Sequence, residues 1–267
     1  MSTLTHLDLF SGIGGFAIAA QNCGYTTIGF CEKEPYAQQI LKERFGAGAT
    51  NGPRLHPDIF TLNGADYAGV DLLTGGFPCQ PFSVAGKRAG AADDRALWPE
   101  MLRVINGAKP TWIIGENVAG IVTMELDNVL CDLEGIGYSA WPLVIPACAV
   151  DARHRRDRVW IVAHADGERG RMREAHRTDA GDARESSCTW QRQNAGQLEP
   201  AVLRMVDGLP ERLDSGGGFC QWPDEDTKTP RVSTGVKHRA HRLRGLGNSI
   251  VPSVACEIIR AIVSCGR

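Results

Sequence analysis

The stretch THLDLFSGIGGFAIAAQNC, residues 5–23, decides the fold of this chain. THLDLF has the character of a short buried strand, SGIGGF supplies three glycines, and AIAAQNC has the character of a helix. The same order returns in TTIGFCE (26–32) and EPYAQQILKERF (34–45). This opening of strand, helix, strand and helix predicts a parallel sheet, because each helix carries the chain back to the same end of the sheet.

Four more apolar segments are expected to be buried strands. They are GVDLLTGG (69–76), PTWIIGENV (110–118), SAWPLVI (139–145) and RVWIVAHA (158–165). Two helices are expected between the earlier ones, over ALWPEMLRVINGA (96–108) and TMELDNVLCDLEGIG (123–137). The alternation predicts the α/β class with a doubly wound, mostly parallel sheet.

The character of the sequence changes after residue 165. Residues 166–197 show no hydrophobic period, and their charges nearly cancel, which is typical of a loop-rich insertion. The tail from about Ser253 has the pattern of a helix that packs back on the sheet. We therefore expect a main domain over residues 1–164, a small region over 165–240 and a C-terminal segment over 241–267 that packs on the first.

Composition excludes several classes of protein. The 267 residues, 43% of them hydrophobic, suffice for one α/β domain with a smaller lobe. No apolar stretch is expected to cross a bilayer, and the N-terminus lacks the features of a signal peptide. Nine cysteines without a CxxC pair argue against a disulfide framework and a zinc site. We expect a cytoplasmic protein with reduced thiols, no metal and no membrane contact.

Charge is distributed unevenly. Residues 1–150 hold 9 basic and 15 acidic residues, whereas residues 151–267 hold 20 basic and 16 acidic ones. Residues 227–248 contain six basic residues and no acidic residue, enough for several phosphate contacts. The second half is the expected face for a polyanion, although such a run is equally typical of a solvated surface.

The glycine-rich turn and two acidic positions point to a cofactor that carries a nucleoside. Gly12 and Gly14 allow the backbone to bend sharply at the start of a helix, whose free N–H groups favour a ligand. Their spacing is not the G-x-G-x-x-G fingerprint of dinucleotide sites, so a plain turn remains an alternative. Glu32 ends the second strand, where this topology places an acid against ribose hydroxyls. Asp58 lies where a third strand would end near an adenine, with Ile59 beside it.

Cys79 lies in GGFPCQPFS (75–83), directly after an apolar strand. Loops at the carboxyl ends of strands are where open α/β sheets bind ligands, and the prolines on both sides restrict this loop. We interpret Cys79 as a preorganised nucleophile; a buried structural thiol is the alternative.

Two further segments carry candidate site residues. Glu116 and Asn117 end another expected central strand with their side chains on opposite faces, and a partly desolvated carboxyl there can act as an acid near neutral pH. Arg156 and Arg158 stand at alternate positions, so on an extended chain they would share a face and reach one ligand. Surface ion pairs with Asp157 are the alternative for these arginines.

Taken in order, these segments resemble the C5-cytosine DNA methyltransferases. DLFSGIGGF (8–16) resembles the family's cofactor loop, GGFPCQPFS its catalytic loop, and ENV (116–118) its glutamate motif. HRRDR (154–158) resembles its Q-x-R-x-R segment, and GNSIVP (247–252) its C-terminal motif. The resemblance implies a Rossmann-like methyltransferase fold, with residues 1–164 as the catalytic and cofactor-binding domain and residues 165–240 as a small target-recognition region.

The resemblance also implies the methyl donor and the residues around it. S-adenosylmethionine is expected with Glu32 on its ribose and with Asp58 and Ile59 at its adenine. The full expected set is Phe10, Gly12, Ile13, Gly14, Glu32, Lys33, Asp58, Ile59, Pro78, Leu97 and Asn248.

The resemblance also implies a separate role for each residue around the target cytosine. The Cys79 thiolate adds to C6 of a cytosine flipped out of double-stranded DNA, Glu116 holds or protonates N3, and C5 then takes the methyl group. Asn117 is expected to support the catalytic loop. Arg158 is expected to contact the flipped base, and Arg156 to assist near Glu116 or at a phosphate.

This chain departs from the family pattern in two places. His154 stands where the family has glutamine, and the variable stretch after the arginines is short. Target recognition is therefore expected from residues 165–240, including Trp190 and Trp222. We expect a monomer from a prokaryote or a phage, with restriction–modification, phage self-protection and an orphan role all open.

Three alternatives remain at this point. One is an RNA cytosine methyltransferase that acts on tRNA, as one branch of the family does. Another is a catalytically inactive DNA-binding or cofactor-sensing homologue. The presence of both Cys79 and Glu116 argues against this alternative. The third is an NAD-binding oxidoreductase, which lacks the glycine fingerprint and gives the Pro-Cys-Gln loop no purpose.

Overall fold

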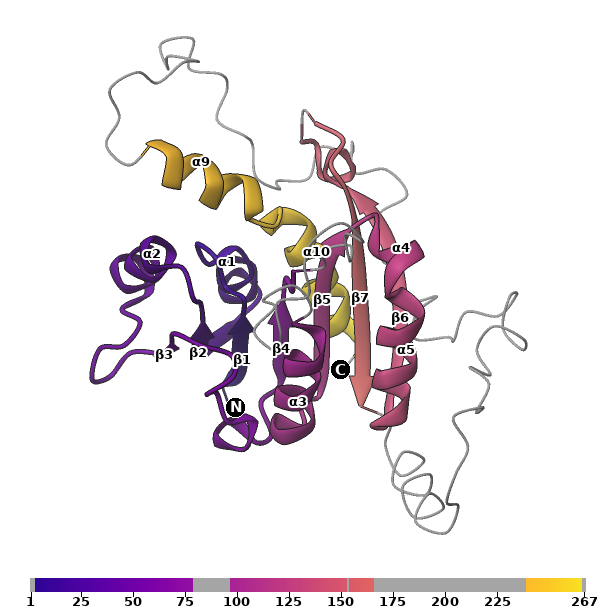
Figure 1. Cartoon of the computed structure of the whole chain (residues 1–267), viewed down its shortest axis with the longest axis horizontal. Coiled ribbons are helices and arrows are strands. Elements are labelled where there is room, and N and C mark those ends of the chain that lie inside the picture. Colours follow the sequence, from indigo (N-terminus) through magenta and orange to yellow (C-terminus); the bar gives the residue numbers. More distant parts are fainter. Residues whose placement is uncertain (1–2, 79–96, 153, 166–238, 266–267) are drawn as a thin grey trace, which may run out of the picture.

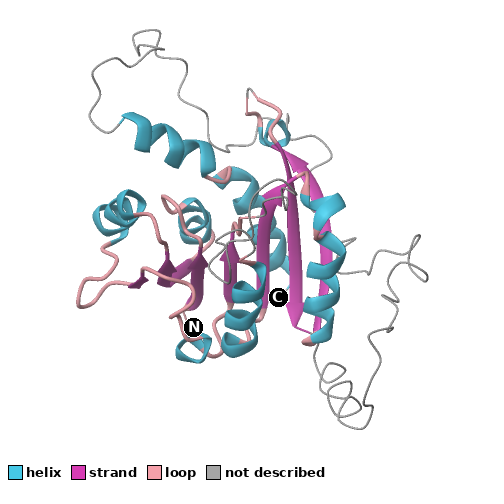
Figure 2. Cartoon of the chain, viewed as in Figure 1, coloured by secondary structure: helices cyan, strands magenta, loops and turns pink. Residues whose placement is uncertain are grey.

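The structure is a computed structural model that describes residues 3–78, 97–152, 154–165 and 239–265 (Figure 1). The strands are β1 (Leu4–Leu9), β2 (Tyr25–Cys31), β3 (Arg54–His56), β4 (Leu72–Gly75), β5 (Trp112–Val118), β6 (Tyr138–Pro146) and β7 (Asp157–Ala165). The α-helices are α1 (Gly15–Asn22), α2 (Pro35–Phe45), α3 (Trp98–Ala108), α4 (Ile121–Met124), α5 (Leu126–Gly135), α9 (Arg239–Asn248) and α10 (Pro252–Cys265). Two short 3-10 helices, η1 (Gly64–Tyr67) and η2 (Ala147–Val150), complete the described elements (Figure 2).

The described strands form one sheet in the order β3-β2-β1-β4-β5-β7-β6. β3, β2, β1, β4 and β5 are parallel, whereas β7 runs antiparallel to both β5 and β6. The chain leaves β1 towards β2 on one side and returns to β4 on the other, so the strand order reverses between β1 and β4. A crevice at the carboxyl ends of the strands is expected at such a switch point.

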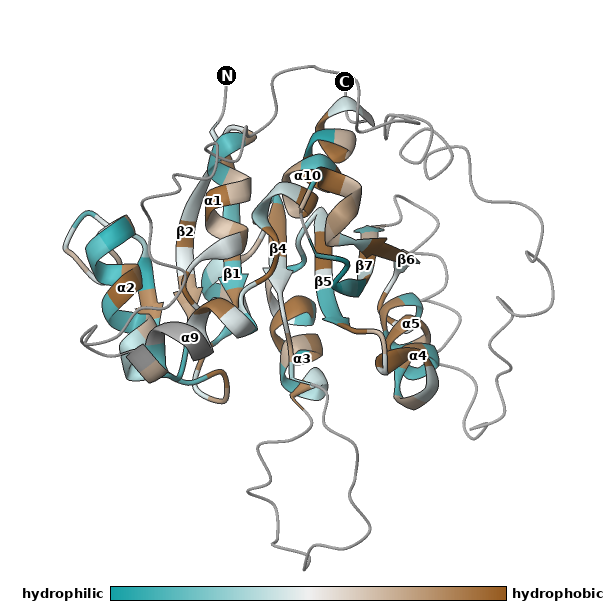
Figure 3. Ribbon diagram, turned by 90° about the horizontal axis from the view of Figure 1, so that it is seen from above, coloured by the Kyte–Doolittle hydropathy of each residue, from teal (hydrophilic) through white to brown (hydrophobic). Residues whose placement is uncertain are grey.

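Neighbouring residues of the central strands point into two separate cores. Leu73 and Ile113 pack with α3 and α5, whereas Leu72 and Ile114 pack with α1 and α10. Seen from above, the sheet lies between these two helical layers (Figure 3). Because both faces are covered, the central strands are largely apolar on both faces rather than alternating, with His6, Asp8 and Thr74 as buried polar exceptions.

Local signals fix the helix that follows β2. The Glu34 side chain accepts from Ala37 N at 2.7 Å, and Pro35 occupies the first turn, where its missing N–H costs nothing. Gly46 ends the helix in the left-handed conformation, at φ 65°. The helix therefore begins directly after β2, at the carboxyl ends of the parallel strands, where Glu32 lies.

The C-terminal helices include the stretch Gly245–Ser264, which is long and apolar enough to span a membrane by length and composition. The helix breaks at residues 249–251 into α9 and α10. Val254, Ile258 and Ile259 of α10 are buried against α1 and the sheet, with Phe16 in the same cluster. This stretch is therefore explained as a core helix and its neighbour.

The doubly wound, mostly parallel sheet confirms the predicted fold class. The predicted helix over 123–137 is divided at Glu125 into α4 and α5. β3 was expected only as a third strand ending near Asp58, without a range of its own, and α9 was not predicted. β3 is only three residues long, and α9 has a polar, basic sequence without an apolar period. Most of the predicted recognition region, with Trp190 and Trp222, lies outside the described residues, so the division into domains stays a prediction.

Candidate active site

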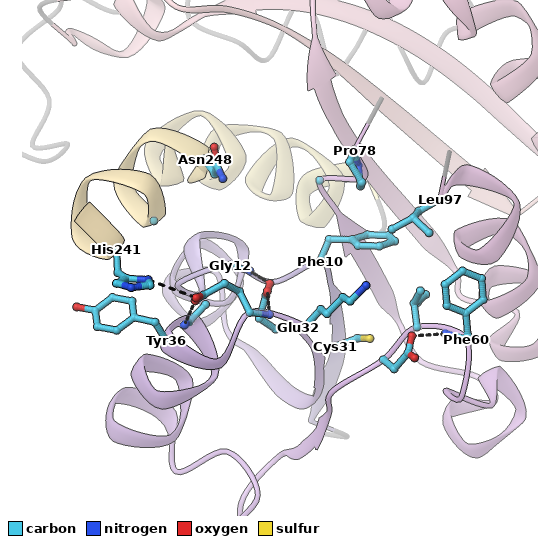
Figure 4. Close-up of a pocket in the computed structure, with 17 residues that line it drawn as sticks. Phe10, Gly12, Cys31, Glu32, Tyr36, Phe60, Pro78, Leu97, His241 and Asn248 are labelled. Carbon is cyan, nitrogen blue, oxygen red and sulfur yellow. Dashed lines mark hydrogen bonds and ion pairs between the residues drawn. The ribbon is translucent and has the colours of Figure 1, made fainter. Parts of the chain in front are cut away.

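A pocket of about 310 Å³ lies at the carboxyl ends of the first strands (Figure 4). Its volume falls in the range of small-molecule sites. Nine of the eleven residues expected around a cofactor line it: Phe10, Gly12, Glu32, Lys33, Asp58, Ile59, Pro78, Leu97 and Asn248. Eight further lining residues were not predicted: Cys31, Glu34, Tyr36, Ala37, Phe60, Gly76, His241 and Gly245. Ile13 and Gly14 are not part of the lining.

Each of the three positions in the turn after β1 requires glycine for a different structural reason. Gly12, at φ 52°, donates its N–H to Glu32 Oε2 at 2.7 Å, and the space beside it is open. Gly14 has φ 86°, and a Cβ there would overlap the ring of Phe45. At Gly15 a Cβ would lie 2.7 Å from Ile250 Cγ1. The last two glycines thus serve packing, and only the first faces the pocket.

Glu32 is held rigidly at the pocket. Its Oε2 accepts from Gly12 N and its Oε1 from Glu34 N, each at 2.7 Å. Burial raises the pKa of this carboxyl above its usual value, while the two backbone N–H groups oppose the shift. Each oxygen keeps a lone pair for a further donor. A vicinal diol such as that of a ribose fits this arrangement.

The opposite side of the pocket is a short turn after β3. Asp58 Oδ1 accepts from Phe60 N at 3.0 Å, which orients the carboxylate. Arg103 of α3 donates to Ile59 O at 2.7 Å and to Leu62 O at 2.9 Å. The turn therefore offers a fixed carboxylate beside apolar side chains, and an adenine ring with its amino group fits that combination.

Helix α9 closes a third side of the pocket. His241 Nδ1 lies 3.5 Å from Glu34 Oε1, and its ring lies 5.5 Å from the ring of Tyr36 (Figure 4). A Cβ at Gly245 would lie 3.2 Å from Ile13 Cγ2, so the helix closely approaches the glycine turn. Only Asn248 was predicted here, from its motif. No local sequence signal marks His241 and Gly245 as pocket residues, because they lie some 200 positions after Glu34 and Tyr36 in the chain.

Glu116 lies beside this pocket at the end of β5. Its side chain is 10% exposed, and Oε1 forms an ion pair with Arg158 Nε at 2.9 Å. Oε2 lies 3.6 Å from the point that a Cβ of Gly76 would occupy, and Gly76 lines the pocket. Burial raises the pKa of Glu116, and the positive charges of Arg158 and Arg156 oppose the rise. This carboxyl can therefore carry a proton at a higher pH than an exposed one.

Asn117 anchors the start of the loop that holds the proposed nucleophile. Its Nδ2 donates to Phe77 O at 2.9 Å, and its Oδ1 accepts from Val118 N at 2.9 Å. Both Glu116 and Asn117 are buried. Cys79 itself lies outside the described residues, two positions after the anchored carbonyl.

The prediction that Arg156 and Arg158 lie on one extended segment is wrong, although the charges of both arginines act on Glu116. β7 begins at Asp157, and Arg156 before it adopts a left-handed backbone at φ 39°. Arg158 turns to Glu116, whereas Arg156 Nη2 donates to Gly247 O at 2.7 Å and to Ser249 O at 2.9 Å. The surface ion pair with Asp157 is made by Arg155. The alternating pattern fails because the extended strand begins only after Arg156.

Among the described residues, no group of three or more histidine, cysteine, aspartate or glutamate side chains could hold a metal ion. The lining combines carboxylates and apolar side chains with the polar groups of Tyr36, His241 and Asn248, and this mixture suits an organic ligand with a sugar and a base.

Comparisons with known proteins connect this site to a family. The chain is 34% identical to the Type II methyltransferase M.BsuFI of Bacillus subtilis over 61% of this chain and 40% of that protein. It is 32% identical to M.NgoMIV of Neisseria gonorrhoeae over 60% of this chain and 51% of that protein. The chain thus spans about half the length of the curated relatives it matches.

The fold has relatives among solved structures. The Dnmt2 methyltransferase of S. pombe matches with a TM-score of 0.52 and 23% identity, over 77% of this chain and 60% of that one. The family model for C-5 cytosine-specific DNA methylases matches residues 4–198. With the sheet, the glycine turn and the glutamate at the end of β5 in place, the chain belongs to the C-5 cytosine-specific DNA methylase family.

Proposed function

We propose that this protein is a DNA (cytosine-5)-methyltransferase that transfers a methyl group from S-adenosylmethionine to C5 of a flipped cytosine. Family membership supports the reaction class, and the pocket supports the donor. The proposed substrate is double-stranded DNA, read by residues 165–240 and acted on by a cytoplasmic monomer. The sequence relatives M.BsuFI and M.NgoMIV are Type II methyltransferases, which favours a restriction–modification setting.

One observation carries the proposal. Gly76 lines the pocket, and Glu116 Oε2 lies 3.6 Å from the point that a Cβ of Gly76 would occupy. A methyl donor in the pocket and a base held by Glu116 would therefore be adjacent, separated only by a residue without a side chain. The loop with Cys79 follows Gly76 through Phe77 and Pro78. Transfer between two bound reactants requires such close placement.

The residues divide the chemistry as follows. Cys79 as a thiolate adds to C6 of the base, which breaks the conjugation of the ring and makes C5 nucleophilic. Glu116 donates its proton to N3 or shares it. This proton neutralises the negative charge that the thiolate brings to the ring when it adds to C6. Arg158 holds Glu116 in place, and Asn117 fixes the start of the loop. Once C5 carries the methyl group, the C5 proton is lost to water, its bonding electrons restore the C5=C6 double bond, and the Cys79 sulfur leaves as a thiolate. N3 returns its proton to Glu116.

S-adenosylmethionine fits the pocket through three kinds of group. Glu32 can accept from the ribose hydroxyls, Asp58 can accept from the adenine amino group, and Ile59 gives an apolar face. When bound, the donor supplies an electrophilic methyl group on a sulfonium. The chain itself contributes position and a dry surrounding for the reacting atoms.

The test is sequencing of 5-methylcytosine in DNA from cells that express the protein. Wild-type protein should leave methylated cytosines in one sequence context, and Cys79→Ser should leave none while still binding the cofactor. Cys148→Ser is the matched control, because Cys148 is exposed on the η2 segment away from the pocket. Methylation by Cys79→Ser at the wild-type level would refute the mechanism.

Two further assays decide between the alternatives. DNA that carries 5-fluorocytosine should trap a covalent complex with wild-type protein, and an inactive homologue would form none. Methyl transfer from labelled cofactor to duplex DNA, but not to tRNA, should distinguish the proposal from an RNA methyltransferase. Transfer to tRNA alone would overturn the DNA substrate.

A further inference from the structure

Arg156 connects the Glu116 side of the site to helix α9, which walls the pocket. Its Nη2 donates to Gly247 O at 2.7 Å and to Ser249 O at 2.9 Å, 91 and 93 positions further along the chain. Two positions later, Arg158 holds Glu116. One short segment at the start of β7 therefore contacts both halves of the site.

The Arg156 guanidinium compensates partial negative charge at the C-terminal end of α9. The last carbonyls of a helix have no partner within the helix and carry partial negative charge. α9 has no basic residue in its own last turn, and its sequence ends in Gly-Leu-Gly-Asn. Arg156 supplies the missing cation from another part of the chain. Both donations come from Nη2, whereas Nε is buried without a hydrogen-bond partner among the described residues.

The anchored carbonyls belong to the two neighbours of Asn248, which lines the pocket. A helix end held on both sides of one residue keeps that residue's position, and at the other end of α9 His241 pairs with Glu34. The left-handed backbone of Arg156, unusual for a residue with a side chain, gives the guanidinium this direction instead of that of the strand.

We propose that Arg156 is a positioning residue that holds the C-terminal end of α9 and thereby completes the wall of the cofactor pocket. The identity of the ligand rests on the proposed function. This role differs from the expected assistance near Glu116 or at a phosphate, because Arg156 Nη2 donates to two backbone carbonyls inside the protein.

Two substitutions separate this role from others. Both hydrogen bonds come from one nitrogen, so the single ammonium of Arg156→Lys can replace them. Arg156→Asn tolerates a positive φ but is too short to reach α9. Arg155→Asn is the matched control, because Arg155 is 82% exposed and pairs with Asp157.

The first measurement is the affinity for S-adenosylmethionine without DNA, by calorimetry. We expect Arg156→Asn to raise Kd about tenfold, and Arg156→Lys and Arg155→Asn to stay within about threefold of wild type. A wild-type Kd for Arg156→Asn, with weakened DNA binding instead, would overturn the inference in favour of a phosphate contact. Loss of affinity in Arg156→Lys equal to that in Arg156→Asn would also overturn it.

The second measurement does not depend on the ligand. Amide hydrogen exchange of residues 239–249 should be faster in Arg156→Asn and near wild type in Arg156→Lys. Should wild-type protein fail to bind S-adenosylmethionine, the proposed function falls, and this exchange alone decides the role of Arg156. Unchanged exchange in Arg156→Asn refutes it. Arg156→Gln takes the place of Arg156→Asn if thermal unfolding shows that the latter does not fold.

Discussion

Replacing Asp8 by asparagine is expected to remove a pH-dependent cost from the free energy of folding. Asp8 is fully buried in β1, and its Oδ1 accepts from Thr74 Oγ1 at 2.9 Å. Thr74 Oγ1 lies 2.8 Å from His6 Nε2, and His6 Nδ1 lies 2.9 Å from Thr27 Oγ1. Because Thr74 donates to Asp8, it accepts from His6. The chain of hydrogen bonds therefore crosses three strands and ends on a carboxyl whose other oxygen has no partner among the described residues.

Burial raises the pKa of Asp8 from 3.8 to about 8, and the hydrogen bond from Thr74 only partly opposes it. Above pH 3.8 the unfolded chain loses this proton, whereas the folded protein keeps it up to about pH 8. Stability is therefore unaffected below pH 3.8 and falls as the pH rises through that window. Each unit is worth ~1.4 kcal/mol, so the loss between pH 5 and pH 7 is about 3 kcal/mol.

Asparagine cannot ionise, and its Oδ1 can still accept from Thr74. Its amide nitrogen takes the place of the unpartnered oxygen, so any fixed cost is the same at every pH. Burial also lowers the pKa of His6 to about 3, which makes the folded state less stable as the pH falls below 6.5. That contribution is common to wild type and variant and cancels in their difference.

The assay is urea unfolding of wild type and Asp8→Asn at pH 5 and pH 7. The variant should gain about 3 kcal/mol relative to wild type between the two pH values. Asp66→Asn, at an exposed position on η1, is the control for the loss of one carboxyl. The same difference between wild type and Asp8→Asn at both pH values would refute a buried, protonated Asp8.

Three other predictions follow from the site. Arg103→Met removes both donors from the turn that carries Ile59, so calorimetry should show about tenfold weaker cofactor binding with the fold intact by circular dichroism. Glu116→Gln cannot give up a proton, so kcat/KM should fall about 100-fold or more and lose its decline at high pH; an unchanged profile would exclude Glu116 as the acid. Gly14→Ala forces a side chain into φ 86° and into the ring of Phe45, so thermal unfolding should reveal a loss of about 1–3 kcal/mol, and wild-type stability would contradict the packing.

Much of the pocket was predictable because it is built from strand ends. In a parallel sheet with helical crossovers, the residues after β1, β2 and β3 must meet at the carboxyl ends of the strands. Gly12, Glu32 and Asp58 therefore fall together once the alternation of strands and helices is read from the sequence. The family motifs added Pro78, Leu97 and Asn248 without geometry. Residues such as Tyr36 and His241 carried no local signal, since their role arises only when α9 lies over α2.

The amino-acid sequence alone predicts the alternation of apolar strands and helices, the glycine turn and the acidic residue after the second strand, because each depends on neighbours within one strand, turn or helix. Tertiary structure alone decided that β7 inserts antiparallel between β5 and β6, and that Arg156 turns to α9 while Arg158 turns to Glu116. It also decided that Asp8 is fully buried, which raises the pKa of its carboxyl. These features depend on atoms brought together from distant parts of the chain, and both desolvation and long-range hydrogen bonds exist only after the layers have packed.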